Sequence, residues 1–191
     1  MASTHLKDLE SADKCGPQFH EISALDIEVE VPIDQVWKWI NDGIAIRKVH
    51  ELKGSNDLKI GTWASPPSEG EGLRQRYLEY ILEIHQPIVG NIKTPVKEVE
   101  ISVHEEAGRM YILETHTLAP KMPYSDDYTP MMRLCIYEKG ENATTVNGWI
   151  WIKWYHKPMF VASKIDSAAT DGLLTTAKQY GQVIQMLSQG V

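Results

Sequence analysis

The feature that most restricts the possible folds is one long amphipathic helix that follows an unbroken series of strand-like segments. From Ile165 to Leu187, apolar residues recur at steps of three and four, which predicts a helix over residues 159–188. A helix with one apolar stripe must bury that stripe against another element. Because the preceding strands are consecutive in the chain, they are expected to form an antiparallel sheet that the helix covers.

Alternation of apolar and polar residues predicts the strands, and two short helices, over residues 33–41 and about 44–52, interrupt them after the first. The fold class is therefore α+β. The order resembles the helix-grip arrangement of START-like proteins, a strongly bent antiparallel sheet of about seven strands with a long C-terminal helix over a cavity. The predicted strands cover residues 25–31, 58–64, 73–84, 96–103, 110–118, 131–138 and 144–155.

The length of 191 residues fits a single domain. Residues 1–17 are polar and predict a flexible tail, which leaves residues 18–191 as one folded domain. No stretch approaches the roughly 20 apolar residues of a membrane helix, and the first residues lack the apolar segment of a signal peptide. The cysteines, Cys15 and Cys135, make no disulfide framework. The simplest setting is reducing and cytoplasmic.

Charge and motifs exclude several function classes. The formal net charge of −7 argues against nucleic acid as a partner, since its binding depends on Lys and Arg at phosphates. No two of the seven His have the helical spacing of a metal site with a Glu between them. Neither a phosphate-binding glycine loop nor a nucleophile elbow is present. The sequence therefore predicts no metal, no cofactor and no catalytic machinery.

Three segments carry a resemblance to one family. Residues 73–94 read LRQRYLEYILEIHQPIVGNIKT, and residues 115–128 read THTLAPKMPYSDDY. The third, residues 154–157, reads WYHK and leads into the long helix. In this order they resemble the VASt family of StART-like sterol-transfer domains, over about residues 19–187. The matching positions are Arg76, Tyr80, Pro87, Ile88, Gly90, Lys93, Thr115, Thr117, Pro120, Pro123, Tyr124, Asp126, Tyr128, Trp154, Lys157, Ile165, Asp166 and Gly172.

The resemblance implies a domain that binds a sterol or similar apolar lipid in an internal cavity and transfers it between membranes. Members of that family are usually parts of larger membrane-anchored proteins with a GRAM domain, and neither feature is in this sequence. The chain is then a piece of such a protein or a stand-alone soluble member. Other START-like proteins are cyclases, hydrolases or sensors of other small hydrophobic ligands, and these functions are the alternatives.

The inward faces of the strands and helix are expected to line the cavity. Alternation assigns Val99 and Ile101 inward. On the last strand, either Trp154 faces inward and Trp149 and Trp151 mark an outer partner face, or this assignment is inverted. Candidates to bond a ligand hydroxyl are Glu114, His116 and Tyr80. The expected lipid-binding residues are Leu78, Tyr80, Leu82, Val99, Ile101, Glu114, His116, Tyr124, Leu134, Ile136, Ile152, Trp154, Ile165, Ala169 and Leu173.

The connection over residues 85–94 combines Pro, Gly and branched apolar residues. It is either a lid that enters a membrane or an ordinary strand connection packed on the core. Basic residues near it would orient an acidic protein on an anionic membrane surface. The expected lid and membrane-facing residues are Pro87, Ile88, Val89, Gly90, Lys93 and Lys157.

Overall fold

The computed structural model describes residue 15 and residues 21–65, 73–86 and 90–190. One strand, two helices, six strands and a long helix follow one another, in the predicted order. The elements are β1 (Ile22–Val29), α2 (Ile33–Asn41), α3 (Ile44–Lys53), β2 (Asn56–Ile60), β3 (Arg74–Gln86), β4 (Gly90–Glu106), β5 (Met110–Leu118), β6 (Tyr128–Gly140), β7 (Ala143–Trp154) and α4 (Ala162–Ser188).

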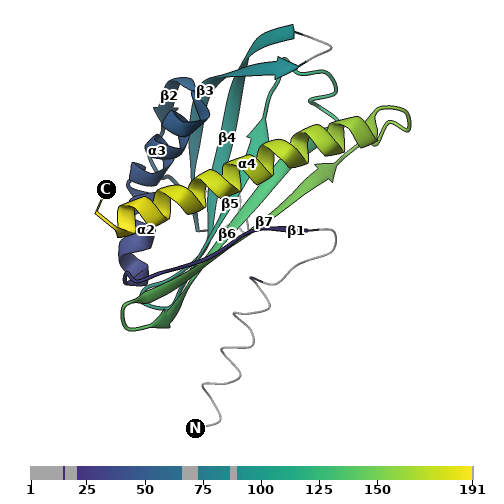
Figure 1. Ribbon diagram of the computed structural model, residues 1–191. Helices are drawn as coiled ribbons and strands as arrows, with labels where there is room; N and C mark the ends of the chain where they lie inside the picture. The colour runs from purple at the N-terminus through teal and green to yellow at the C-terminus, as the bar shows by residue number, and fades with distance from the viewer. Residues whose placement is uncertain (1–14, 16–20, 66–72, 87–89, 191) are drawn as a thin grey trace.

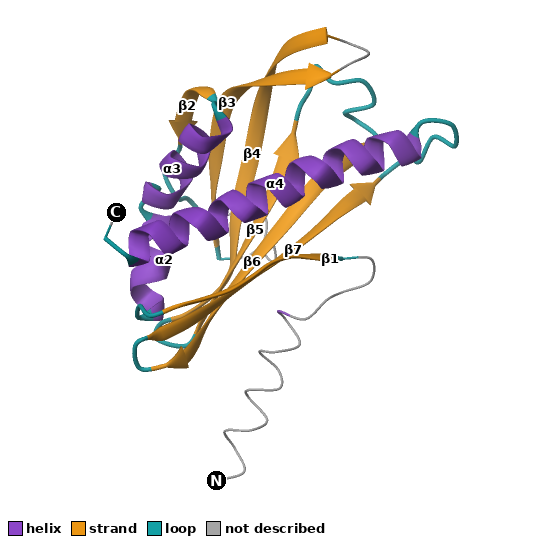
Figure 2. Ribbon diagram, viewed as in Figure 1, coloured by secondary structure: helices purple, strands orange, loops and turns teal. Residues whose placement is uncertain are grey.

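The strands form one curled antiparallel sheet in the order β1-β7-β6-β5-β4-β3-β2. Helix α4 crosses one face of this sheet, and α2 and α3 lie toward the C-terminal end of α4 (Figures 1 and 2). We call the face that packs against α4 the inner face and the opposite one the outer face. The predicted helix-grip fold is confirmed.

The main hydrophobic core lies between the inner face and α4. Leu134 and Ile150 contribute from the sheet and Ile184 from the helix, and all three are almost fully buried. The helix comes very close to β1, because a Cβ added at Gly181 would lie 2.6 Å from Leu25 Cδ1. Within the sheet, a Cβ at Gly148 would lie 2.8 Å from Leu25 Cβ. Small residues at these two positions therefore allow the close approach.

Helix α2 is fixed to the sheet through its first turn. Asp34 accepts hydrogen bonds from the Tyr111 hydroxyl at 2.7 Å and from the Gly108 amide at 2.8 Å. These bonds, chiefly the one from Tyr111, lower the pKa of Asp34. The ring of Trp37 stacks on the Tyr111 ring with centroids 4.7 Å apart. The helix is thus held where it closes one end of the inner face.

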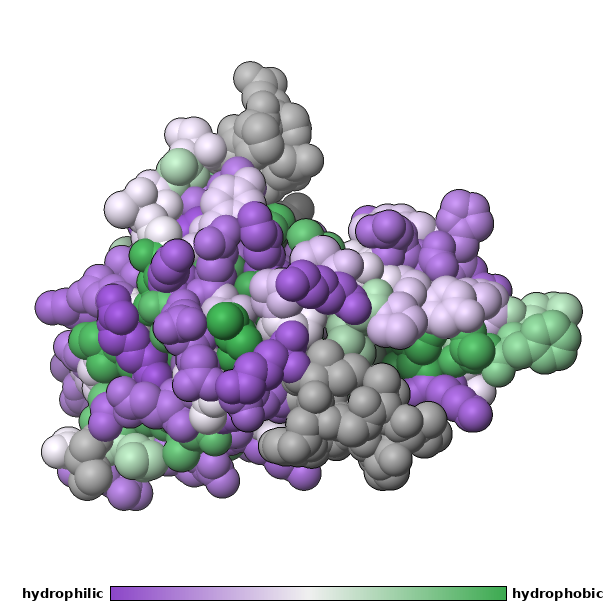
Figure 3. Space-filling model, turned by 90° about the horizontal axis from the view of Figure 1, so that it is seen from above, coloured by the Kyte–Doolittle hydropathy of each residue, from purple (hydrophilic) through white to green (hydrophobic). Residues whose placement is uncertain are grey.

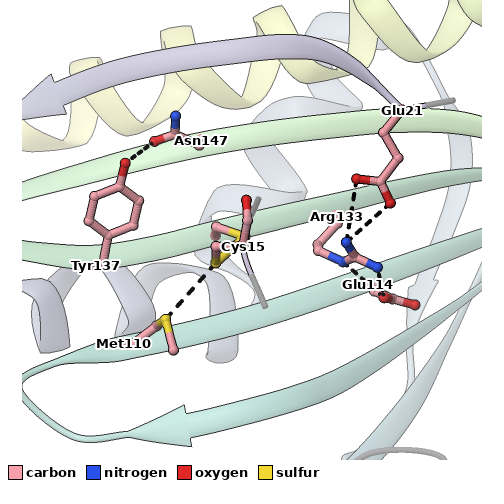
Figure 4. Close-up of a disulfide and its surroundings, with 8 residues drawn as sticks. Cys15, Glu21, Met110, Glu114, Arg133, Tyr137 and Asn147 are labelled. Atoms are coloured by element: carbon pink, nitrogen blue, oxygen red, sulfur yellow. Dashed lines mark hydrogen bonds and ion pairs between the residues drawn. A yellow bond between two sulfur atoms is a disulfide. The ribbon is translucent and has the colours of Figure 1, made fainter. Parts of the chain in front are cut away.

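The outer face carries a second, small cluster built around a disulfide (Figure 4). Cys15 and Cys135 are bonded across 120 residues of sequence, which corrects the expectation of a protein without a disulfide. Trp149 packs on this cluster, and the Arg133 guanidinium lies 5.1 Å from the Trp151 ring. Trp149 and Trp151 therefore face outward, as the first of the two alternatives proposed.

The connection expected over residues 85–94 is mostly strand. β3 and β4 pair continuously as far as Gln86 and Gly90, because their backbone groups satisfy one another residue by residue. Pro87, Ile88 and Val89, on which the expected lid depends, lie outside the described residues, as does the expected tail over residues 1–17 except Cys15. Gly90 belongs to β4.

Candidate functional site

The inner face of β3 and β4 buries charged side chains, which corrects the inward assignment of Val99 and Ile101. Glu98 and Glu100 of β4 are buried on the inner face, whereas Val99 and Ile101 are half-buried on the outer face. Alternation gives the period of a strand but not the face that is buried, and here the neighbouring cations decide it. We call this group the inner polar cluster: His50, Lys53, Arg76, Tyr80, Glu98 and Glu100.

Arg76 and Glu100 form the deepest part of the cluster. Arg76 Nε donates to Glu100 Oε2 at 2.5 Å, and both side chains are almost fully buried. The other guanidinium nitrogens donate to the carbonyls of Ile40 and Asn41 at 2.9 and 2.7 Å. Arg76 therefore satisfies carbonyls at the C-terminal end of α2 while it neutralises a buried carboxylate.

The second half of the cluster joins α3 to the sheet. The Tyr80 hydroxyl donates to Glu98 Oε1 at 2.6 Å, and Lys53 Nζ lies 3.9 Å from the same oxygen. His50 meets the Tyr80 ring edge-on with centroids 4.4 Å apart, and its Nδ1 lies 3.1 Å from Ser55 Oγ. Each of these residues thus has a specific neighbour.

Burial sets the proton affinities of these groups. It raises the pKa of Glu100, and Arg76 opposes that shift. It also raises the pKa of Tyr80 and, on α4, the pKa of Tyr180, with further contributions from the nearby carboxylates. Burial, reinforced by Lys53, lowers the pKa of His50 to about 4. The site therefore presents a neutral imidazole and two phenol groups at neutral pH.

The His50 shift makes stability depend on pH. Since its pKa is about 4 in the folded chain against an ordinary 6.5, the unfolded chain binds more protons between these values. The contribution of neutral His50 to the free energy of unfolding is fully present above pH 6.5 and is lost as the pH falls toward 4. Urea denaturation at a series of pH values should show this decline, and His50→Gln should flatten it. An equally steep decline in the variant would contradict this origin.

An apolar surface continues from the cluster along the inner face. Toward the C-terminal end of α4, Leu173, Ala177 and Ile184 are buried, whereas Ile165 and Ala169 nearer its start are only half-buried. Leu82, Ile152 and Trp154 on the strands are half-buried too. Trp154 Nε1 donates to Asp166 on α4 at 2.7 Å. Apolar inner-face residues are thus partly accessible around the N-terminal half of α4.

The structure brings most of the expected lipid-binding residues to this face. Their role in binding stays a prediction. The residues on the inner face or on the α4 stripe above it are Leu78, Tyr80, Leu82, Leu134, Ile136, Ile152, Trp154, Ile165, Ala169 and Leu173.

The remaining expected residues lie elsewhere. Glu114 accepts from Arg133 at 2.7 Å on the outer face, and His116 lies 3.4 Å from Glu114 on the same face. These two side chains are on the wrong side of the sheet to meet a ligand under α4, which corrects that expectation along with the one for Val99 and Ile101. The chain around Tyr124 forms an exposed turn between β5 and β6.

Five residues of the cluster are absent from the lipid-binding set expected on sequence grounds: His50, Lys53, Arg76, Glu98 and Glu100. One signal was available, because Arg76 shares a strand face with the inward candidates Leu78 and Tyr80. A buried Arg requires a buried acceptor. Glu98 and Glu100 alternate on the next predicted strand, so they were candidates for that acceptor.

Solved structures with this fold include proteins of several kinds. The norcoclaurine synthase of Thalictrum flavum, a point mutant with a transition-state analogue, has a TM-score of 0.56 and 19% identity, covering 91% of this chain and 98% of its own. The Zhui aromatase/cyclase of Streptomyces sp. R1128 has a TM-score of 0.56 and 8% identity, covering 89% and 93%. A conserved protein of Geobacillus kaustophilus has a TM-score of 0.51 and 13% identity, and the match covers 86% of this chain and 93% of its own. These likenesses show the fold alone. No curated protein sequence matches the chain significantly.

The curled sheet with one long helix packed across its inner face is a START-like fold. The model of the VASt family, the VAD1 Analog of StAR-related lipid transfer domain, matches residues 23–172. The chain therefore belongs to the VASt family. Within the described residues, no helix is both long and apolar enough to cross a membrane.

Proposed function

We propose that the chain binds a sterol or a similar apolar lipid between its inner face and α4 and transfers it between membranes. The observation that carries this proposal is the match to a lipid-transfer family over residues 23–172. The half-buried apolar residues around the start of α4 support it, because they would supply both a wall for the ligand and its way in.

A liposome assay tests the proposal directly. Donor vesicles carry a fluorescent sterol and acceptor vesicles carry a quencher, and the full chain is added at substoichiometric amounts. The expected result is extraction of the sterol and its transfer at a rate proportional to protein concentration. Absence of both extraction and transfer would reject sterol as the cargo.

The end of the molecule that carries the β7–α4 connection is the surface we propose for membrane contact. Met159 and Phe160 are 88% and 90% exposed there. Figure 3 shows apolar atoms at the right-hand end of the molecule, where Figure 1 draws this connection. Lys153, Lys157 and Lys164 are exposed nearby in sequence and would favour anionic lipid. Lys157 and Lys93 are ion-paired with Asp166 and Glu83.

Replacing Met159 and Phe160 together with Ser should slow sterol transfer about tenfold or more, since inserting each side chain into lipid is worth about 1.5–3 kcal/mol. Sterol binding in detergent-free solution should remain. The matched control is Leu52→Ser, which removes an apolar side chain that is 49% exposed on α3. Equal transfer rates for both variants would show that the membrane contacts another surface.

The inner polar cluster supports a second candidate, an enzyme that acts on the bound hydrophobic ligand. A neutral His50 and the carboxyl group of Glu100 with its raised pKa are the kinds of group that transfer protons. Two proteins of the same fold are named as a synthase and a cyclase. Mass spectrometry of the ligand before and after incubation separates the candidates, since a transfer protein returns its ligand unchanged.

A further inference from the structure

We propose that Glu100 and Thr115 together form the subsite for one hydroxyl group at the buried end of the ligand. This inference rests on the proposed function and adds to it the residues that recognise the ligand's polar group. The class of ligand is an otherwise apolar alcohol, in contrast to its ester or ether.

Two buried oxygens lack a partner at this place. Glu100 Oε2 is held by Arg76, but Glu100 Oε1 has no hydrogen-bond partner among the described residues. Thr115 Oγ1 is also buried without a hydrogen-bond partner among the described residues. The two residues are 0% and 4% exposed. Leaving a buried polar group unpaired is costly, so each such group in a native protein requires a partner such as a bound water, an ion or a ligand.

The two oxygens belong to one location. Glu100 and Thr115 are directly opposite each other in the β4–β5 ladder, and both side chains face inward. Side chains opposite each other in an antiparallel pair have Cβ atoms about 5 Å apart. On the other side of Thr115, in β6, lies Met132, whose thioether is only a weak hydrogen-bond acceptor for the Thr115 hydroxyl. From α4, Tyr180 is close enough for Glu100 to raise its pKa.

A hydroxyl group fits this pair chemically. It can donate a hydrogen bond to Glu100 Oε1 while it accepts one from Thr115 Oγ1, so it satisfies both oxygens at once. An ether oxygen can only accept and leaves the carboxylate oxygen unpaired. The apolar remainder of the ligand would then lie along Leu78 and toward the half-buried residues near the start of α4.

Thr115→Val tests the subsite, because it replaces the hydroxyl with a methyl group of nearly the same size. The probes are dehydroergosterol, a fluorescent sterol with one hydroxyl, and its methyl ether. The wild-type chain is expected to bind dehydroergosterol about tenfold more tightly than the ether. Thr115→Val should lose most of that preference. The ligand-free variant should unfold at the same urea concentration as wild type or a higher one.

The control is Thr144→Val, since the Thr144 hydroxyl donates to the Val31 carbonyl at 2.6 Å at the far end of β7. It should lower stability without changing the preference for the alcohol. If wild type binds both probes equally, or Thr115→Val lowers stability and leaves the preference intact, the pair only holds water and the inference is overturned. Failure of wild type to bind either probe would overturn the sterol proposal itself.

Discussion

Replacing Arg76 with Met is expected to lower the free energy of unfolding by about 3–5 kcal/mol, the usual effect of removing one partner of a buried ion pair. Glu100 is 0% exposed and would be left without its cation. The carbonyls of Ile40 and Asn41 would lose their donors at the end of α2. Met retains much of the volume, so the loss comes mainly from charge and hydrogen bonds.

Urea denaturation of three variants checks this prediction. Arg74→Met is the matched control, because Arg74 also pairs with a carboxylate, that of Glu105, but its side chain is partly exposed. Both guanidinium groups lie over the Trp63 ring, at 4.4 Å for Arg76 and 4.8 Å for Arg74. It should cost about 1 kcal/mol or less. Arg76→Met combined with Glu100→Leu should recover most of the loss. Equal losses for Arg76→Met and Arg74→Met would contradict the role of burial.

Sequence reasoning succeeded where the structure depends on local patterns and failed where it depends on contacts such as this ion pair. Helix α2 and strand β5 have the predicted bounds, since their periodicity and breakers are local properties. On β7 the first of the two alternatives holds, because Ile150 and Ile152 pack under α4. On β4 the same rule chose the wrong face. Cations from β3 and α3 stabilise Glu98 and Glu100 inside, and these contacts are not local in sequence.

The outer face could not be predicted for a related reason. The Cys15–Cys135 disulfide joins residues 120 positions apart, and no pattern near either cysteine encodes that distance. Glu114 is an inward candidate in a strand that is partly apolar on both sides. Its partner, Arg133, comes from the next strand and brings it to the outer face. The alternation of apolar and polar residues along one strand carries no information about polar contacts with other strands. Such contacts determine which face Glu98, Glu100 and Glu114 occupy.

Replacing Gly148 with Ala is expected to lower the free energy of unfolding by about 1–3 kcal/mol, although alanine suits a strand better than glycine. The new Cβ would lie 2.8 Å from Leu25 Cβ, an atom attached directly to the β1 backbone. Strand β1 is irregular between Ser23 and Leu25, opposite this glycine. Relief therefore requires movement of β1 itself. Denaturant midpoints of the two proteins measure the loss.

Gly181→Ala is the control that makes this prediction specific, because the closest atom to its new Cβ would be Leu25 Cδ1, the end of a flexible side chain. Alanine gains about 1 kcal/mol over glycine within a helix, so the change should be close to neutral in wild type. In a Leu25→Ala background Cδ1 is gone, and Gly181→Ala should stabilise. Gly148→Ala should still destabilise there, since the alanine that replaces Leu25 keeps a Cβ at the same place. If neither Gly148→Ala nor Gly181→Ala destabilises the Leu25→Ala protein, both clashes come from the Leu25 side chain. The close approach of α4 to the sheet would then depend on that side chain and not on the β1 backbone.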